Sequence, residues 1–238
     1  MKIIISPAKR FIKSNYLAKE NLLFLEESKY LVERLRKYTI SEIANIFKVN
    51  DEIAIKTYYD YKEFDFNDLK NPAFFSFDGL VYKQFSNKYF NDLDYLNSHV
   101  FIIDALFGLL KPFTGIRDYR LDMNTFGAKL YKFWADKIYR EIYKEHDTII
   151  NLASDEFSKL VYKYLSYEDI FIDISFLDFK NGKYKITPTW AKEQRGRMLF
   201  YIISNKIENV EELINYTNDG YKYNLSLSNN KKMVFSRN

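Results

Sequence analysis

Short uninterrupted runs of apolar residues recur along this 238-residue chain and predict its β-strands. The runs at 2–6, 100–104 and 148–152 are rich in Ile and Val, which predicts buried strands. Two further runs, at 170–179 and 183–187, flank Asn181-Gly182, a dipeptide typical of a tight β-hairpin. A smaller hairpin is predicted near the C-terminus, from 221–225 paired with 233–236.

Apolar residues spaced three or four positions apart predict helices between these strands. This pattern spans 20–37, 128–145 and 190–206, and another helix follows Ser154, which we expect to cap it. Local signals predict two more helix starts, a capping-box pattern at Thr39 with Glu42, and Asn50 before two acidic residues. Strands and helices interleave without regular βαβ spacing or a linker. We therefore expect a single α+β domain over 1–238, with a mixed sheet surrounded by helices.

Composition excludes several kinds of site. The chain has no cysteine, which excludes disulfide scaffolds, cysteine zinc sites and iron–sulfur clusters, and its two histidines cannot alone form a three-histidine metal centre. The apolar run at 100–110 contains Asp104 and is about half as long as a membrane helix. The apolar run at the N-terminus is too short for a signal peptide. We therefore expect a soluble cytoplasmic protein without a metal or cofactor.

Charge and motif searches leave the activity open. The 36 Lys and Arg against 32 Asp and Glu give a net charge of +4, which neither requires nor excludes a polyanionic partner. The chain lacks the glycine motifs of phosphate-loop NTPases and dinucleotide enzymes, the GxSxG elbow of α/β-hydrolases and the HExxH helix of zinc proteases. These enzyme classes are therefore disfavoured.

The segment IANIFKVNDEIA at 43–54 has the apolar spacing of the helix-hairpin-helix DNA motif. In that motif a tight turn points the first amides of the second helix at a phosphate. Lys48 and Asn50 replace its two glycines, and asparagine tolerates the left-handed backbone that glycine usually provides. Lys48 and the later Lys56 add cations. The alternative is a helix–turn–helix corner that serves only packing.

Four polar clusters adjoin the predicted strands and the last long helix. They are SPAK at 6–9, YRLDM at 119–123, NLASDE at 151–156 and KEQRGR at 192–197. In the last cluster a glycine shares one helix face with two cations, which allows close approach of another backbone. Each cluster also has a structural interpretation, such as a surface ion pair, a helix cap or a solvated helix face.

These clusters belong to a set of blocks that resemble the YaaA family of peroxide-stress-resistance proteins over nearly the whole chain. The blocks are IISPAK at 4–9, FDGLVY at 77–82, LFGLLKP at 106–112, YRLDM at 119–123, LYKFW at 130–134, INLASDEF at 150–157, FLDFKNGKYK at 176–185 and RG at 195–196. The chain departs from the family after Met123, where a glycine is usual, at Ala135, where glycine is frequent, and at Phe157, where tyrosine is common.

The resemblance implies the cantaloupe fold, a positively charged cleft and a helix-hairpin-helix element. It also links the chain to DNA binding, to recombinational repair and to limiting damage from peroxide and free iron. We therefore expect a DNA-binding protein that contacts the phosphates of duplex or branched DNA, or of DNA with unpaired regions. The expected DNA contacts are Lys9, Arg10, Lys48, Val49, Asn50, Lys56, Arg120, Lys192, Arg195 and Arg197.

The alternative is an enzyme that acts on DNA or a nucleotide, because open sheets bind ligands at strand ends. A buried Lys9 would then be a candidate nucleophile. The expected pocket comprises Ser6, Lys9, Tyr119, Arg120, Asp122, Asn151, Ser154 and Glu156. Direct iron binding is disfavoured, because there is no histidine cluster and the adjacent carboxylates of Asp155 and Glu156 lack the i, i+3 or i+4 spacing of helix ligands. Convergence of the four polar clusters on one surface would favour the enzyme.

Overall fold

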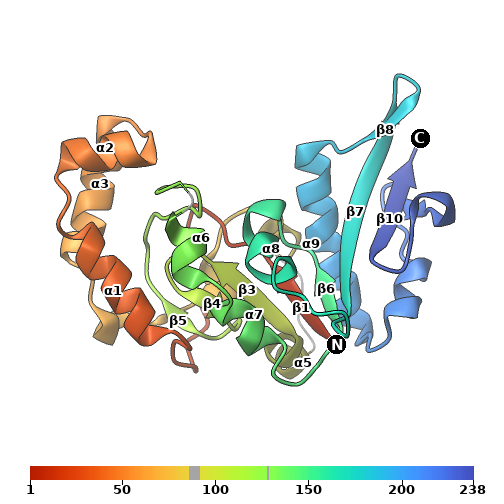
Figure 1. Ribbon diagram of the computed structural model, residues 1–238, viewed down its shortest axis with the longest axis horizontal. Helices are drawn as coiled ribbons and strands as arrows, with labels where there is room; N and C mark the ends of the chain where they lie inside the picture. The colour runs from red at the N-terminus through yellow and green to blue at the C-terminus, as the bar shows by residue number, and fades with distance from the viewer. Residues whose placement is uncertain (86–91, 128) are drawn as a thin grey trace.

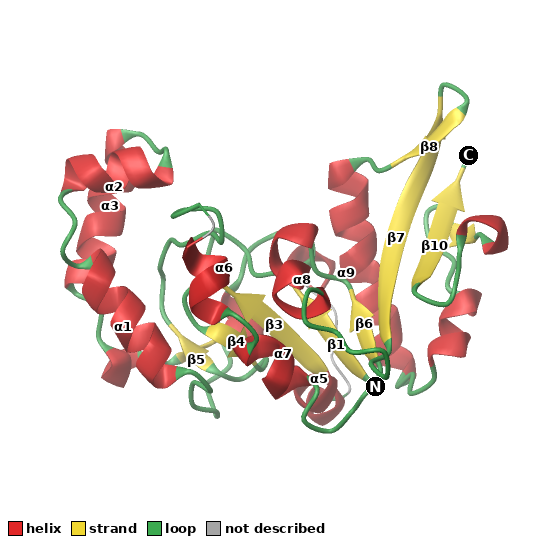
Figure 2. Ribbon diagram, in the orientation of Figure 1, coloured by secondary structure: helices red, strands yellow, loops and turns green. Residues whose placement is uncertain are grey.

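A mixed β-sheet flanked by helices forms the centre of the chain (Figures 1 and 2). The computed structural model describes residues 1–85, 92–127 and 129–238. The strand order of the main sheet is β4-β3-β1-β6-β7-β10-β9, and β8 pairs with β7. Its strands are β1 (Lys2–Ile5), β3 (Val100–Asp104), β4 (Gly108–Leu110), β6 (Ile149–Asn151), β7 (Phe171–Lys180), β8 (Lys183–Lys185), β9 (Lys222–Tyr223) and β10 (Lys232–Arg237), and β2 (Asn71–Pro72) pairs separately with β5 (Gly115–Ile116).

The middle of the sheet is parallel. Strand β1 lies between β3 and β6, with Ile4 opposite Phe101 on one side and Asn151 on the other. Strand β7 runs parallel to both β6 and β10, whereas β4, β8 and β9 pair antiparallel with their neighbours. All four residues of β1 are buried, as expected for a strand covered on both faces. The predicted α+β class and mixed sheet are confirmed, and the cantaloupe topology stays a prediction.

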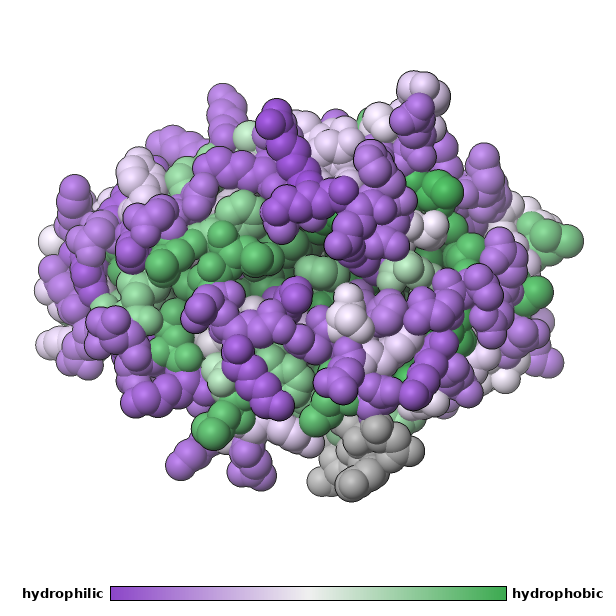
Figure 3. Space-filling model, turned by 90° about the horizontal axis from the view of Figure 1, so that it is seen from below, coloured by the Kyte–Doolittle hydropathy of each residue, from purple (hydrophilic) through white to green (hydrophobic). Residues whose placement is uncertain are grey.

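The helices surround this sheet. They are α1 (Leu25–Leu35), α2 (Ile40–Phe47), α3 (Asp51–Lys62), α4 (Ala73–Ser76), α5 (Leu93–His99), α6 (Lys129–Trp134), α7 (Lys137–Ile142), α8 (Asp155–Tyr162) and α9 (Pro188–Asn205), with 3-10 turns at Phe66–Asp68, Tyr82–Phe85, Val210–Asn215 and Leu225–Leu227. Within the described part of the chain, no helix is long and apolar enough to cross a membrane. Seen from below, hydrophobic residues line a hollow between borders of hydrophilic ones (Figure 3).

Helices α2 and α3 begin where the local signals predict. Thr39 and Glu42 form both bonds of the capping box, and the Asn50 side chain accepts a hydrogen bond of 3.0 Å from the amide of Ile53. The left-handed residue of the turn between these helices is Lys48, with φ of 54°, whereas Asn50 has an extended backbone. The asparagine therefore serves as a helix cap, and the lysine makes the sharp turn.

Two predicted helices differ from the structure. The first begins at Leu25 rather than at 20, because the backbone of Glu20 is hydrogen-bonded to Phe113 and Gly115. The helix predicted over 128–145 is divided into α6 and α7 at Ala135, which has φ of 44°, a conformation that favours glycine. Residue 128 itself lies outside the described residues. The break follows Trp134, which is fully buried and donates a hydrogen bond to the carbonyl of Ala105.

Both predicted hairpins are confirmed. Strands β7 and β8 are joined by Asn181 and Gly182, with φ of 53° and 75°, as a tight two-residue turn requires. Strands β9 and β10 pair antiparallel near the C-terminus, but β10 also joins β7 in a parallel pairing that the sequence pattern did not predict. Helix α9 follows the first hairpin directly and begins two residues earlier than predicted.

Candidate functional site

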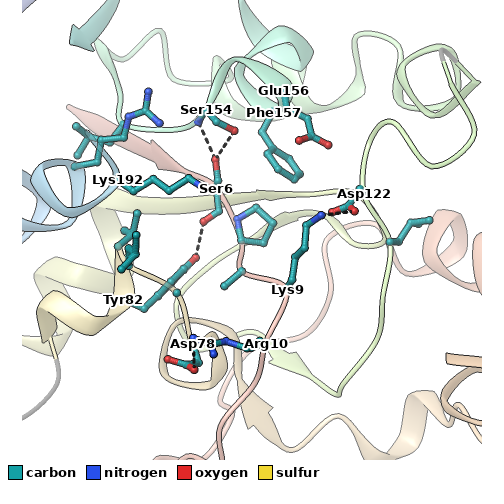
Figure 4. Close-up of a pocket in the computed structure, with 18 of the residues that line it drawn as sticks. Ser6, Lys9, Arg10, Asp78, Tyr82, Asp122, Ser154, Glu156, Phe157 and Lys192 are labelled. Atoms are coloured by element: carbon teal, nitrogen blue, oxygen red, sulfur yellow. Dashed lines mark hydrogen bonds and ion pairs between the residues drawn. The ribbon is translucent and has the colours of Figure 1, made fainter. Parts of the chain in front are cut away.

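A pocket of about 350 Å³ lies at the carboxyl ends of β1 and β6. All four polar clusters of the sequence contribute to it. The predicted site residues that line it are Ser6, Lys9, Arg10, Tyr119, Arg120, Asp122, Ser154, Glu156, Lys192 and Arg195. Figure 4 shows how these side chains surround one space, with residues that follow β1 in the middle, α8 on one side and α9 on another.

Two serines join the strand ends at this pocket. Ser6 Oγ accepts a hydrogen bond of 2.8 Å from the amide of Ser154 and donates one of 3.1 Å to Ser154 Oγ. The phenol of Tyr82 donates to the carbonyl of Ser6 at 2.8 Å. Ser154 is the N-cap residue that precedes α8, as predicted, but its side chain makes no capping bond. Contact with Ser6 replaces the predicted cap, because the parallel pairing of β1 with β6 brings the two segments together.

Two of the five cations in the pocket are paired. Lys9 Nζ lies 2.7 Å from Asp122 Oδ2, and an Arg10 nitrogen lies 3.1 Å from Asp78 Oδ2. The Lys9 side chain is 63% exposed, so the buried lysine expected for the enzyme alternative is wrong.

The other three cations are available for a ligand. Arg120, Lys192 and Arg195 make no side-chain hydrogen bond or ion pair with any described residue, and the Nε atoms of both arginines are buried without a partner. The lining contains five cations and three carboxylates, of Asp78, Asp122 and Glu156, an excess of two positive charges. The pocket is therefore suited to an anionic group that can accept hydrogen bonds.

Glu156 supplies a further unpartnered atom. Its Oε1 is buried without a hydrogen bond from any described residue. Burial, with the nearby charge of Asp122, raises the pKa of this carboxyl group, while the charge of Lys9 and the backbone amides of Met123 and Asn124 oppose the shift. Burial lowers the pKa of Arg195, and Asp173 opposes that shift. A buried polar atom without a partner costs about 1–3 kcal/mol, so a polar ligand that satisfies these atoms would gain free energy.

A buried carboxylate group holds part of the pocket wall in place. Asp104, at the end of β3, accepts a hydrogen bond from the phenol of Tyr119 and bonds of 2.8 and 2.9 Å from the amides of Leu106 and Phe107. Burial raises the pKa of Asp104 to about 6. Tyr61 donates to the carbonyl of Arg120 at 2.8 Å and holds the segment that carries this arginine. These contacts fix the positions of Tyr119 and Arg120 in the pocket wall.

Sequence reasoning missed two polar residues of the pocket wall and the buried carboxylate that holds Tyr119. Asp78 and Tyr82 both lie in the FDGLVY block, which matched the family but did not by itself suggest a site. Asp104 was visible as a lone carboxylate in an apolar run, where a charged residue needs a specific partner.

Several predicted residues lie outside the pocket. Asn151 binds Asp173 at 2.7 Å and the amide of Ala153 at 2.9 Å, so it ties β6 to β7. Arg197 is held by Asp219, Asn218 and Gln84. Lys48, Val49, Asn50 and Lys56 belong to the α2–α3 corner, where Lys56 pairs with Asp60 at 2.8 Å.

Gly196 confirms the predicted close approach of a backbone to α9. A Cβ atom at this position would lie 2.3 Å from the carbonyl oxygen of Val81. Over residues 1–85, 92–127 and 129–238, no group of three or more His, Asp or Glu side chains is arranged to hold a metal ion.

Known proteins match this chain over nearly its whole length. The family model described as peroxide stress protein YaaA matches residues 1–227. A UPF0246 protein of Finegoldia magna is 39% identical over 241 residues, which cover 99% of this chain and 97% of that protein. A UPF0246 protein of Clostridioides difficile is 36% identical over 244 residues, or 99% of each chain. One of Ligilactobacillus salivarius is 34% identical over 250 residues and the full length of both. On this evidence the chain belongs to the family of the peroxide stress protein YaaA.

Proposed function

We propose that this protein binds DNA in the response to peroxide stress, with the pocket beside β1 and β6 as the centre of its DNA contact. The observation that supports this most directly is the group of three cations, Arg120, Lys192 and Arg195, whose side chains make no hydrogen bond or ion pair with a described residue. Arginine and lysine at one concave site suit the phosphates of a nucleic acid. Such contacts carry no base information, so binding is largely independent of sequence.

The α2–α3 corner is the second part of the proposal, as a helix-hairpin-helix contact. Lys48 is exposed at its tip and has no ion pair with a described residue. However, Asp51 and Glu52 occupy the first turn of α3, and Asn50 already bonds one of its amides. Both features oppose a phosphate at this helix end. The pocket therefore contributes more to affinity than the corner does.

The arrangement of the chain makes the two contacts separable. Figure 1 shows α2 and α3 at one end of the molecule, and β1 and α9 away from that end. Variants at Lys48 and at Lys192 therefore probe different parts of the surface.

The test is the salt dependence of duplex binding, measured by fluorescence anisotropy. If about four to six phosphates are neutralised, the slope of log K against log salt is about −4 to −5. Lys192→Glu, in the pocket, should weaken binding to all duplexes and make the slope shallower by about 1. Lys48→Glu should have a smaller effect, and Lys132→Glu, on the exposed face of α6, is the matched control. Affinity that persists in high salt, or a Lys192→Glu variant that binds like the parent, would contradict the proposal.

A second candidate function is catalysis on DNA or a nucleotide in the same pocket, and the convergence of all four polar clusters on that pocket favours it, as expected above. The observation that favours it is Glu156, whose pKa is raised and whose buried Oε1 lacks a partner, close to the ion pair of Asp122 with Lys9. Two carboxylates in different environments can divide the roles of general acid and base. Glu156→Gln should then abolish any product seen by mass spectrometry after incubation with DNA, while leaving affinity intact. Equal product from the variant would reject this role for Glu156.

The link to free iron follows from the same contacts in this proposal. Ferrous ions associate with DNA phosphates as counterions, and basic side chains that neutralise phosphates release counterions. The protein should therefore reduce strand breaks caused by ferrous iron and peroxide in purified plasmid, and Lys192→Glu should protect less. Equal protection by both proteins would separate the iron effect from DNA binding.

A further inference from the structure

The β7–β8 hairpin projects from the sheet as an exposed ribbon (Figure 1). Every residue from 179 to 186 is exposed, although this stretch contains Phe179, Tyr184 and Ile186. The apolar side chains are therefore not held in the core, and packing within the described chain does not explain them.

The hairpin register places its aromatic side chains together on one face. Phe179 pairs directly with Tyr184, their ring centroids are 5.0 Å apart, and the two residues are 45% and 37% exposed. Residues directly opposite each other in an antiparallel pair point to the same side. The pair therefore presents two adjacent rings to solvent.

Lysines occupy the positions next to this aromatic pair, and their side chains leave the opposite face of the ribbon, because side chains alternate along a strand. Lys180 pairs with Lys183, and Lys185 lies opposite Asp178, which is buried and bonded to Tyr221 and Arg237. Lys183 and Lys185 have no ion pair with a described residue. Among the described strands β8 pairs with β7 alone, so a partner along the free edge of β8 meets the rings on one face and the long lysine side chains that extend from the other. Such a partner is anionic and has flat apolar groups.

We propose that the hairpin binds single-stranded DNA, with unpaired bases stacked on Phe179 and Tyr184 and phosphates along the free edge of β8, within reach of the long side chains of Lys183 and Lys185. In a duplex the faces of the bases are already stacked inside, so the two rings would gain little there. This inference rests on the proposed DNA binding and adds a second surface with a preference for unpaired strands. Helix α9 begins at Pro188 and carries Lys192 to the pocket, so a strand leaving the hairpin has a direct route to the first contact.

The test compares a short oligothymidylate with a blunt duplex of equal length. The double variant Phe179→Ala/Tyr184→Ala should lose about 5- to 150-fold in affinity for the single strand, the range expected when one base loses its stacking partner, and keep its duplex affinity. Tyr167→Ala is the matched control, because Tyr167 is 95% exposed and lies in the loop before β7. Lys183→Glu/Lys185→Glu should also weaken single-strand binding and make its salt dependence shallower.

The outcomes separate this inference from the proposed function. If duplex binding is sensitive to Lys192→Glu but the single strand is unaffected by the aromatic variant, the hairpin inference is wrong and the pocket proposal stands. Equal losses for single strand and duplex in the aromatic variant also overturn it. If polyglutamate at equal charge displaces the single strand, the hairpin binds by charge alone. The proposed stacking of bases on Phe179 and Tyr184 is then wrong. A protein that binds neither DNA overturns both proposals.

Discussion

Gly196 offers a sharp test of how α9 is placed against the pocket. The substitution Gly196→Ala adds one methyl group at a point where the helix touches the segment that follows α4. The ideal Cβ would lie 2.3 Å from Val81 O, 2.9 Å from Val81 Cα and 2.7 Å from Gln84 Cγ. Two of these atoms belong to the backbone and cannot rotate away. The helix and the Val81 segment must therefore move apart.

Two effects of the added methyl group oppose each other. Replacing glycine by alanine inside a helix stabilises it by about 1 kcal/mol. Forcing a methyl group into a filled contact costs about 1–3 kcal/mol, and backbone contacts place this site at the upper end. The expected net loss in the free energy of unfolding is about 1–2 kcal/mol. For a chain of this size that lowers Tm by about 2–8 °C.

Thermal and urea denaturation, followed by circular dichroism, measure this loss. Ser204→Ala is the control, because Ser204 is exposed on the same helix and reports helix propensity alone. Since Val81 and Tyr82 line the pocket, Gly196→Ala should also weaken binding of DNA there. A variant as stable as the parent, or more stable, would show that α9 and the Val81 segment can move apart without loss of stability. That result would refute the view that this close contact fixes the position of α9.

Three further predictions concern single side chains. Asn50→Ala should lower the free energy of unfolding by about 1 kcal/mol in urea titration, because helix α3 loses its cap and the amide of Ile53 loses its acceptor. Ser6→Ala should cost about 1–3 kcal/mol in the same assay, since it leaves the Ser154 amide unpaired. Burial raises the pKa of Asp104 to about 6, so its contribution to stability is present below its unfolded pKa and is lost as pH rises through about 6. Stability should fall by about 1 kcal/mol between about pH 5 and pH 7, and Asp104→Asn should flatten that change.

Local sequence determined those elements whose signals lie within a few residues. The capping box at Thr39, the Asn50 cap and the Asn181-Gly182 turn all form as predicted, because each depends on bonds to near neighbours. The run at 100–104 predicts β3 with the bounds that the structure has, since an apolar run rich in β-branched residues has few alternatives to a buried strand. The family blocks also singled out most of the segments that meet at the pocket.

Tertiary structure decided the features that depend on distant partners. A periodic apolar pattern continues through 128–145, but the helix breaks at Ala135, directly after Trp134, whose indole is bonded to Ala105 between β3 and β4. Ser154 bonds Ser6 rather than capping its own helix, because strand pairing brings a residue 148 positions away within reach.

Contacts between distant parts of the chain also decide which residues form the site. Sequence alone could name Arg120, Lys192 and Arg195 as cations, but only their neighbours show which of the basic residues lack a partner. Arg197, one turn away from Glu193, is held by Asp219 from another part of the chain. Whether a side chain is free to bind a ligand is a property of the whole fold, because partners far apart in sequence neutralise it or leave it exposed.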